Sequence, residues 1–328
     1  MELKTNAALA ASLKNTQAWR AYDREMAVAA SHAYLLLSED EVASEQTLLM
    51  MAARAYCPTV CLQCAECRKV LDHNKPDVAE PNPTGDALTV EVAEGVVEDA
   101  AMGSFEGGKK IYIFRNMQRQ SERVQNLLLK TLEEPNENVM FLLSATSTKG
   151  ILPTVLSRVK TLPLPPFGEQ EIVAILQQEG VATPEVFAKA GQGNLALTLA
   201  LSGDESYFAL VDEAVDLLAT LHSSTAIPQW LYRPIFAKES IAKTLDVMEI
   251  ALKDIMYVKS GIPQTVVYRN KLSVYREAAP LYPARSLPML LDLINEAKLK
   301  VASHCTAVNV ADSLLLAMLE VKSLCKRS

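Results

Sequence analysis

Residues Ile111–Leu143 read IYIFRNMQRQSERVQNLLLKTLEEPNENVMFLL, and this stretch determines the class of fold. It begins with the apolar run Ile111–Phe114 and ends with Val139–Leu143, each typical of a buried parallel strand. Between them, Ser121 is suited to cap a helix whose apolar residues recur at helical spacing, and Pro135 ends that helix. A strand, a helix and a strand in this order predict a βαβ unit of a mainly parallel sheet.

Towards the N-terminus, two further strands are predicted. Ala33–Leu37 (AYLLL) is a short apolar run, and Thr89–Val92 alternates polar and apolar side chains. Towards the C-terminus, Pro163–Gly168 (PLPPFG) places three prolines within four positions, which no regular element tolerates. We therefore expect an α/β domain with a parallel sheet over residues 1–165 and a domain boundary at this segment.

Beyond the boundary the strand signals disappear and helical periodicity dominates. The predicted helices are Glu169–Gln178, Pro184–Ala190, Ile241–Met256, Leu287–Val301 and a last helix that starts near the capping residue Asn309. A GQGN turn at Gly191–Asn194 closes the first two of them. This pattern predicts a small helical domain over residues 166–205 and an all-helical domain over residues 206–328.

Composition limits the class of protein. Of the 328 residues, 49% are apolar and 22% are charged, which is typical of a packed globular protein. The net charge of −7 argues against a general nucleic-acid coat, which has a basic excess. Met1–Leu13 lacks the continuous apolar core of a signal peptide, and no run approaches the roughly 18 apolar residues of a membrane span. We expect a cytoplasmic protein with no membrane partner.

Four of the six cysteines fall in one short stretch with the spacing C-x3-C-x2-C-x2-C. They are Cys57, Cys61, Cys64 and Cys67. In a reducing cytoplasm such crowding indicates a metal site, and four thiolates suit tetrahedral zinc. The role is expected to be structural, because four protein ligands leave no open position for catalysis. The alternatives are a set of buried thiols, or His73 as a distant substitute for Cys57.

The turn after the first predicted strand, Ser38–Thr47 (SEDEVASEQT), occupies the place of a phosphate-binding loop, G-x-x-x-x-G-K-[ST]. Ser38 and Ala43 stand at the two glycine positions, Ser44 at the lysine position and Glu45 at the hydroxyl position that binds magnesium. Four carboxylates would repel a nucleotide's phosphates here: Glu39, Asp40, Glu41 and Glu45. We expect no tight ATP binding and no intrinsic ATPase activity.

Several short motifs surround this turn in collinear order over roughly residues 30–165. They are SHAYL at Ser31–Leu35, KPD at Lys75–Asp77, FEGGKK at Phe105–Lys110, LLKTLEEP at Leu128–Pro135 and ILPTVLSR at Ile151–Arg158. Together they resemble the bacterial clamp-loader branch of the AAA+ family. The resemblance implies an AAA+ α/β domain with a zinc module at residues 57–67, a helical lid domain and a C-terminal helical collar domain.

The departures from that family are informative. Where the family's active members carry an Asp-Glu pair after the central strand, this chain has Arg115-Asn116, and neither residue can hold magnesium as a carboxylate. The combined losses resemble the non-catalytic stator of the DNA polymerase III clamp loader. By the same resemblance, Arg158 is an arginine finger for the ATP of an adjacent subunit, with Val159 in place of the family's Cys. The alternative is that Arg158 pairs with a nearby carboxylate.

The resemblance also implies partners. These are the tau/gamma and delta subunits of the loader, with the sliding clamp and primer–template DNA engaged through the complex. Lys130, Glu133 and Glu134 form either a solvated helix end or part of a subunit interface, and Thr146 is a remnant of a nucleotide sensor. Two other functions remain open: an active ATPase with an unusual phosphate loop, and a free-standing zinc-dependent nucleic-acid-binding module.

Overall fold

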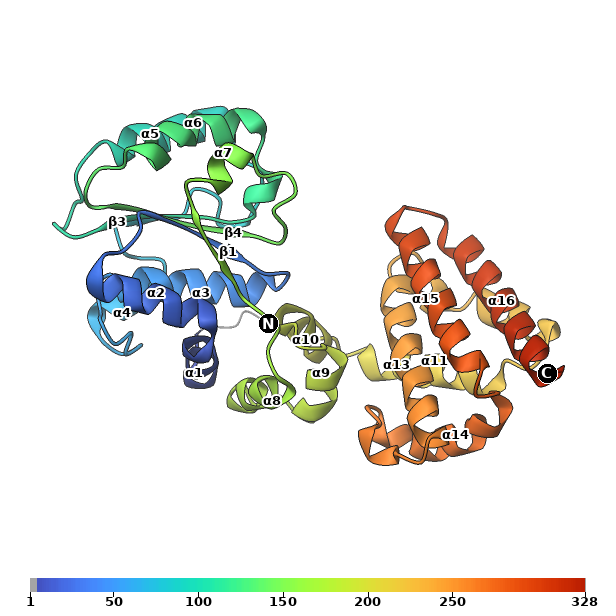
Figure 1. The fold of residues 1–328 in the computed structure, drawn as a ribbon. Helices are drawn as coiled ribbons and strands as arrows, with labels where there is room; N and C mark the ends of the chain where they lie inside the picture. The colour runs from blue at the N-terminus through green and yellow to red at the C-terminus, as the bar shows by residue number, and fades with distance from the viewer. Residues whose placement is uncertain (1–4, 328) are drawn as a thin grey trace. The chain divides into compact units, whose positions relative to one another are not determined.

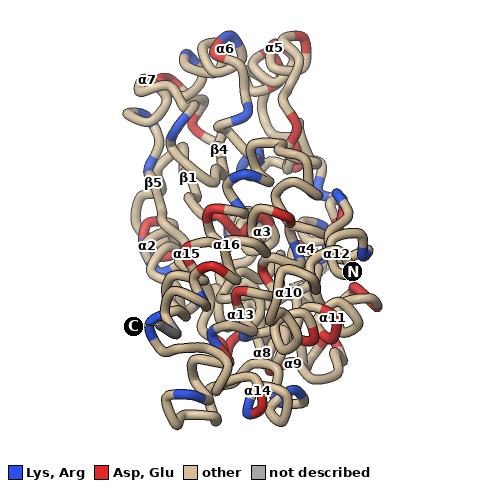
Figure 2. The backbone as a smooth tube through the Cα atoms, turned by 90° about the vertical axis from the view of Figure 1, so that its right-hand side faces the viewer, with Lys and Arg blue, Asp and Glu red and all other residues tan. Residues whose placement is uncertain are grey.

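The structure, a computed structural model, describes residues 5–327. The chain divides into two compact units, the first ending at Ala200 and the second beginning at Leu201 (Figure 1). In the part of the chain that is described, no helix is both long and apolar enough to cross a membrane. Basic and acidic positions are interspersed along the chain in both units (Figure 2).

The first unit is built around a five-stranded parallel sheet with the strand order β2-β3-β4-β1-β5. Its strands are β1 (Ala33–Leu37), β2 (Val78–Ala79), β3 (Lys110–Phe114), β4 (Val139–Ala145) and β5 (Lys160–Pro163). Every residue of β3 and β4 is buried, as expected of strands covered on both faces. The predicted parallel α/β fold is confirmed, as are the strands predicted at Ala33–Leu37, Ile111–Phe114 and Val139–Leu143.

Helices cover both faces of this sheet (Figure 1). One face carries α5 (Val90–Ala100), α6 (Glu122–Glu133) and α7 (Pro153–Leu156), and the other carries α2 (Gln17–Val28), α3 (Glu41–Arg54) and α4 (Ala65–Leu71). Tyr112 and Phe141 stack with ring centroids 5.4 Å apart beneath α5 and α6, in a core that includes Leu128 and Leu132. Ser121 caps α6 by accepting from the backbone N–H of Val124, as predicted.

The strand predicted at Thr89–Val92 is wrong. Thr89 is instead the N-cap of α5, and its hydroxyl accepts a hydrogen bond from the backbone N–H of Val92. Ala93, Val96 and Ala100 then form the buried stripe of an amphipathic helix. Four alternating residues are too few to distinguish a period of 2.0 from one of 3.6. The sheet is completed by β2 and β5, which were not predicted.

Two further groups of helices lie in the first unit, except that the last two residues of α10 fall in the second. Helix α1 (Ala7–Asn15) precedes the sheet, and β5 ends at Pro163, where the boundary was predicted. The chain then forms α8 (Glu169–Gln178), α9 (Pro184–Ala190) and α10 (Leu195–Ser202). The bounds of α8 and α9 match the prediction, and Gly191–Asn194 connects α9 to α10. The prediction of three domains over residues 1–165, 166–205 and 206–328 stays a prediction.

The second unit is helical among its described residues. It contains α11 (Tyr207–Thr220), α12 (Ile227–Leu231), α13 (Ile241–Lys259), α14 (Leu272–Ala278), α15 (Ser286–Ala302) and α16 (Ala307–Arg327). A buried hydrogen bond of 2.7 Å joins the Tyr207 and Tyr268 hydroxyls in its core. The last helix begins at Ala307 rather than near Asn309, because the turn before Asn309 is already helical, with the Val310 N–H donating to the Thr306 carbonyl.

Candidate functional site

The turn between β1 and α3 is tied to the start of α10 through Asp40. Asp40, which is only 5% exposed, caps α3 by accepting from the Ala43 N–H at 2.9 Å. The same carboxylate accepts from the backbone N–H groups of Leu195 and Ala196 at the start of α10. Burial raises the pKa of Asp40 above its ordinary value, and the N–H donors oppose that shift. The backbone N–H groups at a helix start commonly bind an anion such as phosphate, and here the Asp40 carboxylate accepts from them instead.

The residues predicted to replace a phosphate loop and an acidic pair are brought together in space. Arg115 follows β3, and its guanidinium lies 2.9 Å from the Glu45 carboxylate of α3 and 2.6 Å from that of Glu80. Asn116, in a left-handed conformation with φ of 52°, donates from its side chain to Glu41 at 3.3 Å. Thus an internal ion pair links the two degenerate motifs.

These groups line a small cavity of about 160 Å³. Its walls are Ser38, Glu41, Val42, Ser44, Glu45, Thr84, Gly85, Arg115, Asn116, Ser144, Ala145 and Thr146. Ser44 is 4% exposed, and within the described part of the chain neither its hydroxyl nor the Arg115 Nε–H has a hydrogen-bond partner. The walls carry two carboxylates and one guanidinium, and neither a lysine nor an aspartate is among them. At the end of β3, where an active member of the family carries an Asp-Glu pair for magnesium, the cavity wall is formed by Arg115 and Asn116.

Arg158 lies outside this cavity, just after α7. Its guanidinium forms an ion pair with Glu133 at the end of α6 and donates to the Thr154 carbonyl at 2.6 Å and to the Ser157 hydroxyl at 3.2 Å. The Arg158 side chain is 30% exposed. In this chain Arg158 therefore pairs with a nearby carboxylate, and it is not among the residues that line the cavity.

The other residues of that motif and the sensor position are also placed. Lys130 and Glu134 are exposed, which fits both a solvated end of α6 and a subunit interface. Thr146 follows β4, and its hydroxyl accepts from the Gln118 side chain at 3.1 Å. Thr146 also lines the cavity, and its role as a remnant of a nucleotide sensor stays a prediction.

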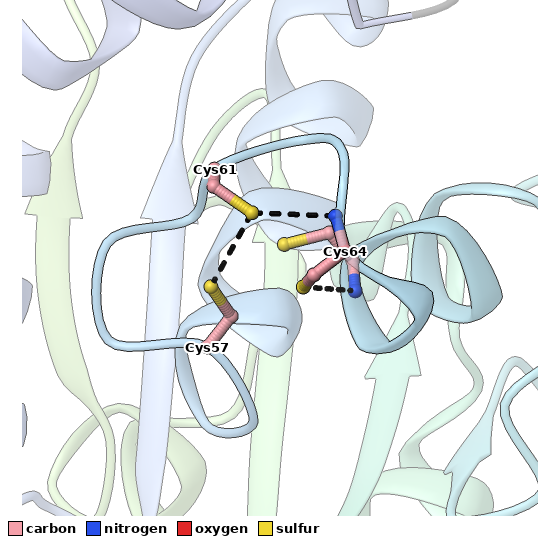
Figure 3. Close-up of side chains that lie close together, drawn as sticks. Cys57, Cys61 and Cys64 are labelled. Carbon is pink, nitrogen blue, oxygen red and sulfur yellow. Dashed lines mark hydrogen bonds between the residues drawn. The ribbon is translucent and has the colours of Figure 1, made fainter.

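The four clustered cysteines converge on one point (Figure 3). Cys57 follows α3, Cys64 caps α4, and Cys67 lies in its first turn. All four Sγ atoms lie within 4.8 Å of one another, and those of Cys57 and Cys61 are 3.8 Å apart. A tetrahedral zinc with Zn–S bonds of about 2.3 Å requires sulfur–sulfur distances of about 3.8 Å. The residues present therefore fit a zinc ion.

Backbone donors already point at these sulfurs. The N–H of Cys64 donates to the Cys61 Sγ at 3.3 Å, and the N–H of Cys67 donates to the Cys64 Sγ at 3.4 Å. The backbone N–H of Cys61 is the main cause that lowers the pKa of the Cys57 thiol to about 6, whereas burial raises that of Cys67 to about 12. His73 pairs with Glu80 and is not one of the four clustered ligands, so the alternative of a histidine ligand is not supported.

Sequence reasoning missed the partners that complete these arrangements. Glu80 and Asn82 follow the two-residue strand β2, and Asn82 accepts from the Arg115 N–H at 3.0 Å. No sequence motif marks either residue. The ion pair between Arg158 and Glu133 joins two of the recognised motifs. The sequence predicts a carboxylate partner for Arg158 as an alternative, but it does not indicate which carboxylate.

Comparisons with known proteins agree with the motifs. A family model described as DNA polymerase III, delta subunit, matches residues 15–168. A DNA polymerase III subunit delta' from Bacillus subtilis is 23% identical over 302 residues, covering 88% of this chain and 91% of that protein. A subunit delta' from Haemophilus influenzae is 32% identical over 132 residues, covering 39% of this chain and 40% of that protein.

Similarity extends to other subunits and to solved structures. The DNA polymerase III subunit tau of Escherichia coli is 28% identical over 184 residues, covering 52% of this chain and 28% of that protein. The crystal structure of a DNA polymerase III, gamma subunit-related protein from Thermotoga maritima aligns with a TM-score of 0.45 at 14% identity, covering 94% of this chain and 100% of that chain.

Proposed function

We propose that this chain belongs to the clamp-loader branch of the AAA+ family, in which it resembles delta-prime subunits of DNA polymerase III, and that it is the loader's non-catalytic stator. It binds no ATP of its own and supplies Arg158 to the ATP site of an adjacent subunit. Its partners are the tau/gamma and delta subunits, with the sliding clamp and primer–template DNA engaged through the complex.

The observation that carries this proposal is the ion pair between Arg115 and Glu45. In an active site the corresponding positions would hold a magnesium carboxylate and a magnesium-binding hydroxyl. Here they neutralise each other, and Glu80 completes the arrangement. A nucleotide would have to break this pair and bring its phosphates among Glu41 and Glu45, with no lysine on the cavity wall to compensate.

Arg158 supports the second half of the proposal. A guanidinium is always charged and offers planar donors, so it can stabilise the charge that develops on a transferred phosphoryl group. Arg158 is partly exposed and lies outside its own domain's cavity, so a phosphate supplied by another subunit is the substrate that it would contact. To do so it would leave Glu133, and because exposed ion pairs contribute little, that exchange costs little.

The zinc ion of the proposal would be held by Cys57, Cys61, Cys64 and Cys67. It would supply a structural cross-link between the end of α3 and the start of α4. Since all four ligand positions belong to the protein, we assign it no chemistry on nucleotide or DNA.

The arginine finger is tested by Arg158→Ala in a reconstituted loader with clamp, primed DNA and ATP. Turnover at the adjacent site is expected to fall on the order of 10³-fold, so the loader loses that site's share of DNA-stimulated hydrolysis. Arg158→Lys keeps the positive charge but lacks the planar guanidinium donors, so its turnover is expected to lie between that of Arg158→Ala and that of wild type. Arg24→Ala, which removes an exposed arginine on α2, serves as the matched control. Wild-type turnover in Arg158→Ala would refute the finger.

The missing ATP site is tested on the isolated chain. Equilibrium binding with ATP and magnesium up to millimolar concentration is expected to give no saturable signal. Saturable binding at micromolar ATP would favour the active-ATPase alternative and overturn the stator proposal.

A further inference from the structure

The loop between the first two cysteines is held from outside by a lysine of a distant helix. Lys14 lies in the last turn of α1, and its ammonium donates to the carbonyls of Thr59 at 2.9 Å and Val60 at 3.0 Å. Both carbonyls belong to the three residues that separate Cys57 from Cys61. Lys14 therefore contacts the backbone that spaces two of the four sulfurs.

This loop requires support because its backbone is strained. Within the loop Val60 has a φ of 44°, and Leu62, directly after Cys61, has a φ of 64°; both lie in the left-handed region, which residues other than glycine disfavour. The turn is tight, with the Val60 N–H donating to the Cys57 carbonyl at 3.0 Å. Within that turn the carbonyls of Thr59 and Val60 point outward, where the ammonium meets them.

Helix α1, which carries Lys14, is held firmly in place. Leu9 and Leu13 are fully buried, so the inner face of α1 is locked in the core of the first unit. At its start, Asn6 caps the helix and also donates from its side chain to the Glu179 carboxylate at 2.7 Å. The Ala8 N–H donates to the Gln178 side chain at 3.0 Å. A lysine on a helix anchored in this way is pre-positioned for the loop, so less freedom is lost when it binds.

We propose that Lys14 is a positioning residue of the metal site, which keeps the Cys57–Cys61 loop in the shape that places both sulfurs on the zinc. This inference rests on the zinc site of the proposed function. Lys14 supplies no ligand, and it acts on the metal only through the two carbonyls. Partners of this outer kind orient the ligands and slow the loss of the ion.

The test is the rate at which zinc leaves the full-length chain for a chromogenic chelator. Lys14→Met keeps the length and the apolar body of the side chain but removes the donors, and we expect zinc release about tenfold faster than wild type. Lys14→Arg, which restores donors to the carbonyls, is expected to return the rate to near wild type. Arg20→Met removes a positive charge from the same surface, where Arg20 and Lys14 line one hollow, and should release zinc at the wild-type rate.

A second measurement separates positioning from general stability. The thermal midpoint of each variant is compared with zinc and after its removal. A positioning role predicts that Lys14→Met lowers the midpoint of the zinc-loaded chain and changes that of the zinc-free chain less. If Lys14→Met does not fold, Lys14→Gln is used, since its amide is too short to reach both carbonyls.

The outcomes distinguish the inference from the proposal beneath it. A wild-type chain purified with zinc available that holds no zinc would remove the metal site itself. A wild-type chain with one zinc, together with wild-type release from Lys14→Met, would overturn the role of Lys14 and leave the metal site standing. Equal acceleration in Arg20→Met would assign the effect to surface charge and also overturn it.

Discussion

At the scale of single residues, the central feature is a basic side chain in place of a metal-binding acid. The Arg115 side chain is 15% exposed and lies between Glu45 and Glu80, of which Glu80 is 10% exposed. An arginine so placed costs desolvation, and its two carboxylate partners offset that cost. The cavity around Ser44 is thus stabilised by groups of the chain itself, without a ligand.

We expect Arg115→Met to lower the free energy of unfolding. Removing one partner of a fully buried ion pair costs roughly 3–5 kcal/mol, and because this pair is partly exposed we expect about 2 kcal/mol. Urea unfolding of the isolated chain provides the measurement. The double variant Arg115→Met/Glu80→Gln should recover part of the loss, since the Glu80 carboxylate oxygen that loses the guanidinium is then no longer charged. Equal stability of Arg115→Met and wild type would show that the guanidinium contributes nothing to the cavity.

The ion pair of Arg158 leads to a separate expectation. Glu133→Gln frees the guanidinium, which still donates to the Thr154 carbonyl. Exposed pairs contribute about 0–1 kcal/mol, so folding should be unchanged and turnover of the reconstituted loader should rise by at most about fivefold. The effect should vanish when Arg158 is already alanine. A rise that persists in that background would mean that Glu133 acts independently of the finger.

What the sequence predicts at this scale follows from how local each feature is. The acidic turn Ser38–Glu45 and the four cysteines are adjacent in sequence, so their chemistry could be recognised without a structure. The pairing of Arg115 with Glu80 joins residues 35 positions apart through a two-residue strand. Lys14 reaches its loop from 45 positions away. Contacts between residues so far apart in sequence depend on how the elements pack, and that packing cannot be predicted from residue types and their spacing.

At the scale of secondary structure elements, Asp40 connects two helices. Its carboxylate accepts from Ala43 at the start of α3 and from Leu195 and Ala196 at the start of α10. Both are helix N-termini, whose unpaired N–H groups and dipoles favour a negative partner. One residue of the degenerate phosphate turn thereby orders the helical segment that follows the sheet in sequence.

We expect Asp40→Ala to destabilise the first unit by about 2–3 kcal/mol, because each lost cap costs ~1 kcal/mol and a buried pocket is left with unpaired donors. Asp40→Asn, which keeps an acceptor, should cost less. Glu39→Ala at the exposed neighbouring position is the matched control and should leave stability unchanged. Thermal or urea unfolding decides the matter, and equal losses in Asp40→Ala and Glu39→Ala would contradict the role of Asp40.

The predicted elements succeeded where the pattern was long. α6 carries a cap, a full apolar stripe and a proline stop, and α8 and α9 begin and end where their periodicity does. The prediction failed at Thr89–Val92. The Thr89 hydroxyl caps a helix, but in so short a stretch it fits the polar position of an alternating strand equally well. β2 and β5, of two and four residues, are too short to give a pattern of their own and form only by pairing with neighbours.

At the scale of the whole molecule, the first unit contains the sheet, the cysteine cluster, α8, α9 and most of α10, while the second is built from helices. Each unit has its own buried core. The cysteine cluster lies entirely in the first unit, so any stabilisation from a metal bound there belongs to that unit.

A cut after Gly203 leaves α10 whole and keeps the Asp204–Lys243 ion pair in the second fragment. We expect residues 1–203 to fold alone, to bind one zinc per chain, and to lose about 10 °C of thermal midpoint on chelation, since a structural zinc contributes several kcal/mol and each kcal/mol shifts the midpoint by about 2–4 °C. Residues 204–328 should melt at the same temperature with and without chelator. Full-length protein should show the shift only in the transition of its first unit, because the cysteines cross-link no other part of the chain. If the metal leaves residues 1–203 without moving their midpoint, the cluster binds zinc but does not hold the fold together, and its role must be sought in contacts with other subunits.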